Sequence, residues 1–355
     1  MPEGVASPAD EEGGAVSFSE RLSADWYAPG LTALTGALAP LAPLFASGAA
    51  LRRALYRRGI LRVERLPVPV IVVGNLSVGG SGKTPLVAAL GAALRSAGRR
   101  PGIVSRGYGR AQASAAPLLV TAATDPALAG DEPALLARAG LPVAVAADRA
   151  AAGRALMAAH PECDVIIADD GLQHYALARD FEIAVVDAAR GFGNGWRLPA
   201  GPLREPASRL ASVDAVVLLA AEAADERLAW PNAFRMTLAG ATFHGVADPL
   251  RTATAQEFGG AGVHALAGIG NPARFFATLS RLGIQATSHA FPDHYRFVAA
   301  DIAFPGARAI LMTEKDAVKC AGFADTRCWY LPVAAEIDPR LVARVLEKLR
   351  GSQAA

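Results

Sequence analysis

Lysine is scarce in this 355-residue sequence, although arginine is abundant. Lysine and arginine together number 35, but the only lysines are Lys83, Lys315, Lys319 and Lys348. Because lysines are so few, the presence of Lys83 inside a glycine-rich loop is poorly explained by chance. The formal net charge is only +2, so the chain has no overall basic field, and we expect no nucleic-acid partner.

Cysteine is almost absent as well. The three cysteines are odd in number and lack metal-ligand spacing, which excludes a disulfide framework and indicates a reducing compartment. Hydrophobic residues make up 52% of the chain and charged residues 19%, as in a folded α/β protein with a large core. The length suits about two domains.

Charge is missing from residues 26–51, and a group of arginines follows directly: Arg52, Arg53, Arg57, Arg58, Arg62 and Arg65. The preceding residues, 1–25, are acidic, which is not the basic start of a secretory signal, and we expect them to be partly disordered. The uncharged run is long enough to span a membrane. Its prolines, Pro29, Pro40 and Pro43, weaken a continuous helix.

We therefore expect residues 26–65 to form helices that lie in the membrane interface, with the arginines on anionic headgroups. An apolar helix packed on the protein itself is the alternative. If the segment spans the membrane, the arginines place the rest of the chain in the cytoplasm.

Apolar runs alternate with helical spacing from residue 66 onward. The runs are 68–74, 102–105, 142–147, 164–169, 182–187 and 215–220. They predict a mostly parallel sheet flanked by helices over residues 66–230. We expect a linker hairpin at 231–262 and a smaller α/β domain at 263–350. That domain should contain strands near 265–269, 309–313 and 328–333, and a final helix near 338–350.

The stretch VGNLSVGGSGKTPL (73–86) follows an apolar run and precedes a helical pattern, as a phosphate-binding loop does. Its candidate nucleotide-binding residues are Ser77, Val78, Gly79, Gly80, Ser81, Gly82, Lys83 and Thr84. The glycines let backbone N–H groups converge on an anion, and the helix N-terminus adds its dipole. Lys83 would reach the β- and γ-phosphates, and the Thr84 hydroxyl would bind Mg²⁺.

Two positions of this loop depart from common patterns. Ser77 stands where the usual pattern has its first glycine, at the entry to the loop. Val78 stands where ATPases that act as dimeric switches carry an additional lysine, so that chemistry is disfavoured. A glycine-rich turn without a ligand is the alternative interpretation of the whole loop.

A second motif, DVIIADDGLQH (164–174), puts Asp169 and Asp170 at the end of an apolar run. Adjacent carboxylates at a strand end repel each other unless a cation is near. In a phosphate-loop enzyme, carboxylates at this place hold Mg²⁺ or its water. A turn before Gly171 is the plain alternative.

Seven motifs occur in a fixed order: VGNLSVGGSGKTP, SRGYGR, GDEP, ADDGLQH, LPAGPLREP, FPDHYRF and TEKD. Together they resemble the tetraacyldisaccharide 4'-kinase family of Gram-negative bacteria, over residues 26–345. The resemblance implies transfer of the γ-phosphoryl of ATP, with Mg²⁺, to the 4'-hydroxyl of a tetraacylated glucosamine disaccharide 1-phosphate. It also implies work at the cytoplasmic face of the inner membrane.

The resemblance further implies residue roles. It makes Asp131 of GDEP the catalytic base with His294 of FPDHYRF as its partner, and adds Glu205 to the metal-binding aspartates. It assigns contact with phosphate or acceptor to Arg106, Tyr108, Arg110, His174 and Arg204.

Structural alternatives stay open for most of these residues. Asp131 would cap a helix, and His294 would be a loop histidine, with His289 as a rival for the catalytic role. Arg204 would form a surface ion pair, His174 would be a satisfied structural residue, and the arginines of SRGYGR would be solvated. TEKD (313–316) resembles motifs that read nucleobases, and a capped helix start explains it nearly as well.

Two other functions remain possible from the residues alone. The first is a phosphate-loop NTPase that acts as a switch in protein targeting or metal insertion. Val78 and the lack of a Cys/His cluster argue against this function. The second is a non-catalytic membrane adaptor, against which stand the carboxylates near the phosphate loop.

Overall fold

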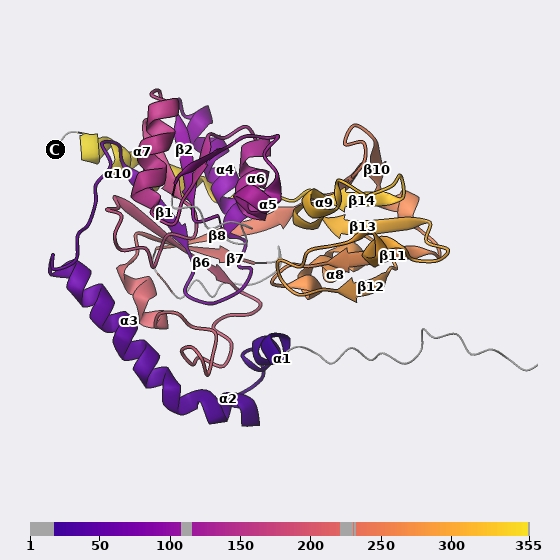
Figure 1. The fold of residues 1–355 in the computed structure, drawn as a ribbon, viewed down its shortest axis with the longest axis horizontal. Coiled ribbons are helices and arrows are strands. Elements are labelled where there is room, and N and C mark those ends of the chain that lie inside the picture. Colours follow the sequence, from indigo (N-terminus) through magenta and orange to yellow (C-terminus); the bar gives the residue numbers. More distant parts are fainter. Residues whose placement is uncertain (1–17, 108–115, 221–229, 231, 354–355) are drawn as a thin grey trace, which may run out of the picture.

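The computed structural model describes residues 18–107, 116–220, 230 and 232–353 (Figure 1). Within them a large sheet has nine strands in the order β15-β8-β7-β6-β1-β5-β2-β4-β3. The strands are β1 (Val70–Gly74), β2 (Pro101–Ser105), β3 (Leu118–Val120), β4 (Val143–Val145), β5 (Val165–Ala168), β6 (Phe181–Asp187), β7 (Ala215–Leu219), β8 (Ala233–Ala239) and β15 (Ala334–Ile337). Only β3 and β15 run antiparallel to their neighbours. The expected mostly parallel sheet is confirmed.

Strand β1 has apolar residues at every position because both of its faces are covered. Ile71 and Val73 lie in one hydrophobic cluster, with helices α4 (Lys83–Ser96), α6 (Asp131–Arg138) and α10 (Pro339–Gln353). Val70 and Val72 lie in the cluster on the other face, with helix α7 (Arg149–Ala159). The short helix α5 (Pro126–Ala129) and a 3₁₀ turn at Ala207–Ser212 complete this part of the chain.

A second sheet lies beside the first, at the right of Figure 1. In the described residues it has six strands in the order β10-β9-β14-β13-β11-β12. They are β9 (Thr242–Gly245), β10 (Thr252–Thr254), β11 (Val263–Ala267), β12 (Thr287–Ala290), β13 (Ala309–Thr313) and β14 (Cys328–Leu331). Helices α8 (Pro272–Arg281) and α9 (Glu314–Cys320) belong to separate hydrophobic clusters. Two 3₁₀ turns, Ala255–Phe258 and Ala299–Ile302, lie among these elements.

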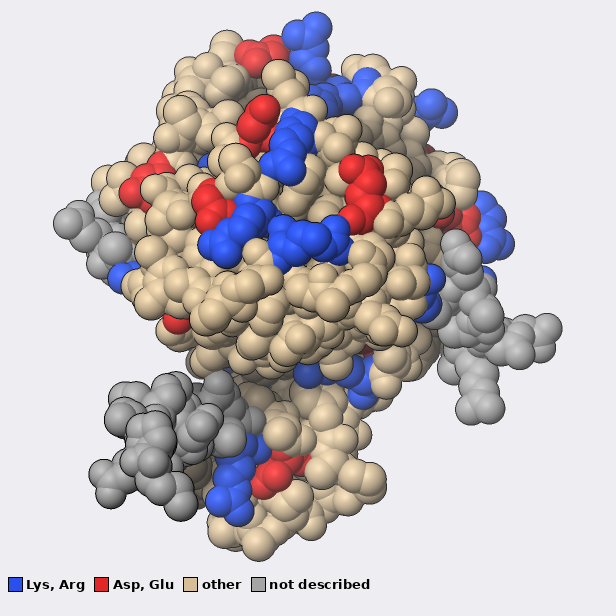
Figure 2. All heavy atoms as spheres, turned by 90° about the vertical axis from the view of Figure 1, so that its right-hand side faces the viewer, with Lys and Arg blue, Asp and Glu red and all other residues tan. Residues whose placement is uncertain are grey.

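The surface of the second sheet that faces the viewer in Figure 2 carries basic and acidic side chains interspersed with one another. A mixed surface of this kind does not concentrate potential of one sign. Its electrostatics therefore act between neighbouring residues and not over the whole face.

Membership of the two sheets corrects the expected division of the chain. The segment expected as a linker hairpin is split, because β8 belongs to the large sheet and β9 to the second. The chain also returns to the large sheet through β15, which pairs with β8, and α10 packs on α4. The end of the chain is therefore not part of the second sheet, contrary to the expected boundary at 263–350.

Two short connections thus join the sheets, 240–241 and 332–333. They lie against each other, since a Cβ at Gly240 would overlap the carbonyl oxygen of Pro332. Long-range pairing of β8 with β15 creates this double connection, and no local pattern announces it.

The N-terminal part forms an arm of helices outside both sheets: α1 (Phe18–Asp25), α2 (Ala33–Leu38), a 3₁₀ turn (Ala39–Leu41) and α3 (Ala42–Arg57) (Figure 1). The stretch Ala33–Arg57 is long and apolar enough to cross a membrane by length and composition alone, and its most apolar window is only 11% buried. Most of this stretch therefore does not pack against the rest of the described residues, although Arg53 and Tyr56 of α3 contact the ring of Tyr175. The expected disorder of residues 1–25 falls largely outside the described residues.

Candidate active site

The phosphate loop runs from the end of β1 to the start of α4, as its motif predicts. Gly82 is the N-cap of α4 with φ of 83°, and a Cβ there would lie 2.8 Å from Cδ2 of Leu219. The side-chain amide of Asn75 donates to Oγ of Ser81 at 2.9 Å and to the carbonyl of Gly79 at 3.3 Å. These bonds hold the loop so that the N-terminus of α4 is available to an anion.

The paired aspartates follow β5, which is hydrogen-bonded to β1, so they lie beside the loop. Oδ1 of Asp170 is 3.4 Å from Nζ of Lys83, and Oδ2 is 3.4 Å from Nη1 of Arg204. Burial favours the neutral acid, but the charges of Lys83 and Arg204 hold the pKa of Asp170 below its usual value. The structure thus brings together the lysine, one aspartate and the arginine of LREP.

Asp169 is fully buried, and both of its carboxylate oxygens lack a hydrogen-bond partner among the described residues. Burial first, and then the nearby charges of Glu132 and Asp170, raise its pKa to about 7. A buried carboxylate without donors is costly on its own. The arrangement suits a cation that would compensate it.

Glu205 lies elsewhere in this network. Its Oε1 accepts the hydroxyl of Tyr175 at 2.6 Å, and its Oε2 is 3.3 Å from Nε of Arg209. In the described part of the chain no three His, Cys, Asp or Glu side chains are grouped as a metal site would require. The carboxylate expected as a third metal ligand is therefore engaged with an arginine and a tyrosine.

Asp131 and His294 meet across the two sheets, although they come from distant motifs. Oδ2 of Asp131 is 3.3 Å from Nδ1 of His294. The N-cap of α6 is Gly130, so Asp131 stands in the first turn and does not cap the helix. Burial opposes ionisation, but the bond to His294 and the charges of Lys319 and Lys315 lower the pKa of Asp131. The rival, His289, instead pairs with His264 at 3.0 Å.

His174 contacts Arg149, which sequence reasoning did not single out. Nη1 of Arg149 is 3.5 Å from Nδ1 of His174, and its Nη2 donates to the carbonyl of Asp170 at 2.9 Å. A guanidinium only donates, so Nδ1 of His174 is assigned as acceptor and Nε2 carries the proton. Burial, then Arg149 and Arg179, lower the pKa of His174 to about 4. The imidazole is neutral at physiological pH.

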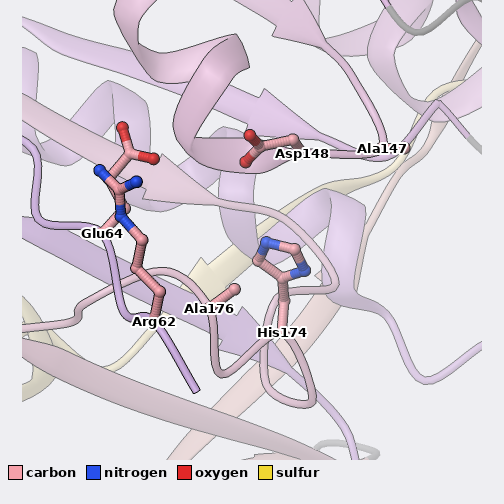
Figure 3. A pocket seen from close by; sticks show the side chains of 6 residues that line it. All are labelled: Arg62, Glu64, Ala147, Asp148, His174 and Ala176. Atoms are coloured by element: carbon pink, nitrogen blue, oxygen red, sulfur yellow. The ribbon is translucent and has the colours of Figure 1, made fainter. Parts of the chain in front are cut away.

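A cavity of about 350 Å³ lies beside His174 (Figure 3). Arg62 and Glu64, from the chain just after the N-terminal arm, lie on one side of it, and Asp148 and His174 lie on the other. Arg106 is exposed just after β2. Tyr108 and Arg110 lie outside the described residues.

The phosphate loop also contacts the part of the chain that forms the second sheet and the N-terminal arm. No sequence motif predicts these contacts. A Cβ at Gly80 would lie 3.5 Å from Cα of Gly270, in the loop after β11. Nη1 of Arg190 donates to the carbonyl of Gly270 at 2.6 Å, and its guanidinium stacks over the ring of Tyr27 at 4.3 Å. The hydroxyl of Tyr27 donates to the carbonyl of Val78 at 3.1 Å. The large sheet, the second sheet and the N-terminal arm therefore meet at the phosphate loop.

The TEKD segment begins α9. Thr313 is the N-cap, and its side chain accepts from the backbone N–H of Asp316. The carboxylate of Asp316 is buried and accepts the N–H of Gly268 at 3.0 Å. The TEKD segment is therefore a capped helix start, and the carboxylate of Asp316 is hydrogen-bonded to the backbone of its own domain.

The chain is similar to known proteins along nearly its whole length. A family model described as tetraacyldisaccharide-1-P 4'-kinase matches residues 34–350. A tetraacyldisaccharide 4'-kinase of Azoarcus sp. (strain BH72) is 54% identical over 325 residues, which are 92% of this chain and 94% of that protein. The corresponding kinase of Dechloromonas aromatica (strain RCB) is 53% identical over 90% of this chain and 93% of its own length.

A solved structure agrees with these relatives. The crystal structure of LpxK from Aquifex aeolicus in complex with ATP matches with a TM-score of 0.73 and 30% identity, over 89% of this chain and 99% of that one. With the phosphate loop, the paired aspartates and the Asp131–His294 contact in place, the family model and these relatives lead to one conclusion: the chain belongs to the tetraacyldisaccharide-1-P 4'-kinase family.

Proposed function

We propose that this protein transfers the γ-phosphoryl group of ATP to the 4'-hydroxyl of a tetraacylated glucosamine disaccharide 1-phosphate. The observation that carries the proposal is the convergence of Lys83, Asp170 and Arg204 at a phosphate loop that also contacts the second sheet. Phosphoryl transfer demands positioning and charge neutralisation more than covalent chemistry. Two cations and a helix N-terminus at one place supply both.

The chain's residues divide the work as follows. The loop N–H groups, Lys83 and Arg204 bind the phosphates of ATP. Thr84, Asp169 and Asp170 would hold Mg²⁺, and the unpartnered carboxylate of Asp169 supports this assignment. When bound, the ion would neutralise phosphate charge. Glu205, held by Arg209 and Tyr175, instead fixes the loop that contains LREP, just before the 3₁₀ turn Ala207–Ser212.

Asp131 is the acceptor for the proton of the sugar hydroxyl. A hydroxyl is a poor nucleophile at neutral pH, and a positioned base helps it. The lowered pKa of Asp131 keeps this carboxylate ionised and able to accept, and His294 orients it.

The N-terminal arm docks on an anionic membrane surface, at the cytoplasmic face of the inner membrane. Exposed large apolar side chains are concentrated in the arm and directly after it: Leu31, Leu41, Leu44, Phe45, Leu51, Ile60 and Val63. Arginines stand among and after them, as interfacial helices require. The cavity between Arg62 and His174 lies where the arm joins the body, a suitable place for part of the acceptor's head group.

The direct test uses γ-labelled ATP with the acylated disaccharide 1-phosphate in vesicles. Label in the lipid supports the kinase, and label found only as free phosphate would support an NTPase switch instead. A folded Lys83→Ala protein should be nearly inactive, because it loses the cation that meets the transferred phosphate. Near-normal turnover of that variant would overturn the assignment of the loop.

A further inference from the structure

Lys315, the lysine of the TEKD segment, connects the two motifs that supply Asp131 and His294. Its Nζ lies 3.5 Å from Oε1 of Glu132 and 3.4 Å from Oδ1 of Asp293. Glu132 directly follows Asp131 in the chain, and Asp293 directly precedes His294. One side chain therefore binds the sequence neighbour of each member of the pair.

The three segments come from different parts of the fold. Glu132 lies in α6, which packs in the core of the large sheet, whereas Lys315 lies in α9 on the second sheet. Asp293 lies in the loop after β12. The Asp131–His294 contact thus crosses between the sheets, and Lys315 crosses beside it.

The charges at this junction require a cation. Glu132 and Asp293 lie within 3.5 Å of the Lys315 ammonium group, and Asp131, which Lys319 also influences, adds a third negative charge nearby. Burial acts against that charge, yet Glu132, Asp293 and Asp131 raise the pKa of Lys315 above its ordinary value, so the lysine stays protonated. Without it, α6 and the loop after β12 would approach each other with like charges, which is unfavourable.

The other lysine of α9 is not a substitute. Nζ of Lys319 lies 2.7 Å from Oδ1 of Asp316 and donates to the carbonyl of Gly268 at 3.3 Å. This ion pair and this hydrogen bond lie within the second sheet and its adjoining loops, and toward the large sheet Lys319 contributes only the charge that helps to lower the pKa of Asp131. Lys315 is the lysine that spans the junction.

We propose that Lys315 is a positioning residue of the kinase: it clamps α6 to the loop after β12 so that Asp131 and His294 meet in the geometry that accepts the proton of the sugar hydroxyl. This proposal rests on the proposed function, because the role of Asp131 and His294 in accepting the proton comes from that function. Lys315 acts through Glu132 and Asp293 and does not touch the reacting atoms.

The experiment compares Lys315→Met with the unchanged enzyme. Methionine keeps the apolar stem and removes the charge. Loss of the clamp misplaces the base, so kcat should fall by about 10- to 100-fold. KM for ATP should change by less than about twofold, because the phosphate loop is untouched. Lys348→Met, at an exposed position of α10, is the matched control and should keep kcat.

A double mutant separates positioning from other roles. In an Asp131→Asn protein the base is already lost, so adding Lys315→Met should scarcely lower the remaining rate. Full additivity of the two substitutions would overturn the proposal. So would an unchanged kcat in Lys315→Met, or a raised KM for the lipid at unchanged kcat, which would make the lysine an acceptor-binding residue.

One further variant covers the case in which Lys315→Met is too unstable to assay. If Lys315→Met does not fold, Asp293→Asn removes one end of the clamp and keeps the lysine, and the same fall in kcat at constant KM for ATP is expected, to a smaller degree. A failure of the proposed base itself looks different: Asp131→Asn alone would then keep its kcat. A loss of kcat with Asp131→Asn and none with Lys315→Met, or with Asp293→Asn where Lys315→Met does not fold, rejects the role of Lys315 and leaves the base in place.

Discussion

Asp131 and His294 are 163 positions apart in the chain, and yet Oδ2 of the aspartate lies 3.3 Å from Nδ1 of the histidine. The histidine adopts a left-handed backbone conformation, with φ of 61°, which is unusual for a residue other than glycine. Strained positions of this kind cluster at functional sites. The candidate base is therefore assembled only when both sheets are in place.

We expect Asp131→Ala and His294→Ala each to lower kcat by about 10²-fold, the range that general-base catalysis commonly supplies. The double mutant should be scarcely slower than the poorer single mutant, because one member of the pair has little to do without the other. Steady-state kinetics with equilibrium ATP binding, which should change little, measures this. An Asp131→Ala protein that melts early but keeps its kcat at low temperature would show a purely structural residue.

The approach of Gly270 to Gly80 is a second relationship between the sheets. A Cβ at Gly270 would overlap the backbone nitrogen of Gly80, and backbone cannot move aside as a flexible side chain can. We expect Gly270→Ala to displace the phosphate loop, to weaken ATP binding, and to destabilise the protein by about 1–3 kcal/mol.

Gly322→Ala is the matched control for that substitution. A Cβ at Gly322 meets nothing within 4 Å, so this variant should bind ATP and unfold as the unchanged protein does. Calorimetric ATP titration and thermal unfolding check both variants. Equal behaviour of the two would mean that the loops do not meet in solution.

Local patterns predicted those parts of the fold that depend on neighbouring residues. The run VPVIVVG becomes β1 because both of its faces are buried, and the glycine-rich stretch after it forms the phosphate loop. The pairing of β8 with β15 depends on segments nearly a hundred residues apart, so the boundaries of the second unit were wrong. The local sequence of a short strand does not indicate which other strand it pairs with.

The candidate site divides in the same way. Asp170 is expected beside the phosphate loop because carboxylates at a strand end hold Mg²⁺ or its water in phosphate-loop enzymes, and it lies 3.4 Å from Lys83. Arg149 was missed, although it also stands near the end of a strand, β4, because it belongs to no motif. The contacts of Glu205 could not be predicted, since they depend on the side chains of Tyr175 and Arg209.

Membrane docking is testable at single exposed positions. Leu44 and Leu51 of α3 are 71% and 60% exposed, and burying a leucine is worth about 1.5–3 kcal/mol. We expect the double variant Leu44→Glu/Leu51→Glu to bind vesicles that contain anionic lipid at least about tenfold more weakly than the unchanged protein.

Leu250→Glu supplies the control, since Leu250 is 91% exposed but lies far along the chain, in the second sheet's part. This variant should float with vesicles as the unchanged protein does. Flotation on a density gradient measures all three proteins. If the α3 variant floats undiminished, the docking surface lies elsewhere.

The buried imidazole of His174 should make the protein sensitive to acid. Its pKa falls from about 6.5 to about 4 on folding, through burial and then the charges of Arg149 and Arg179. Between these values the unfolded chain binds a proton that the folded protein does not, so stability falls as pH falls from 6.5 to 4 and is fully present above 6.5.

We therefore expect His174→Gln to flatten the loss of thermal stability over this window, because glutamine does not titrate. Unfolding temperatures of both proteins, measured from pH 8 to pH 4, check this. At pH 8 the imidazole is neutral in both states, so the difference there gives the packing effect of the substitution alone. An NMR titration reads the site directly and should give a pKa near 4 for His174. A value near 6.5 would mean that the imidazole is solvated and that Arg149 does not hold it in the neutral form.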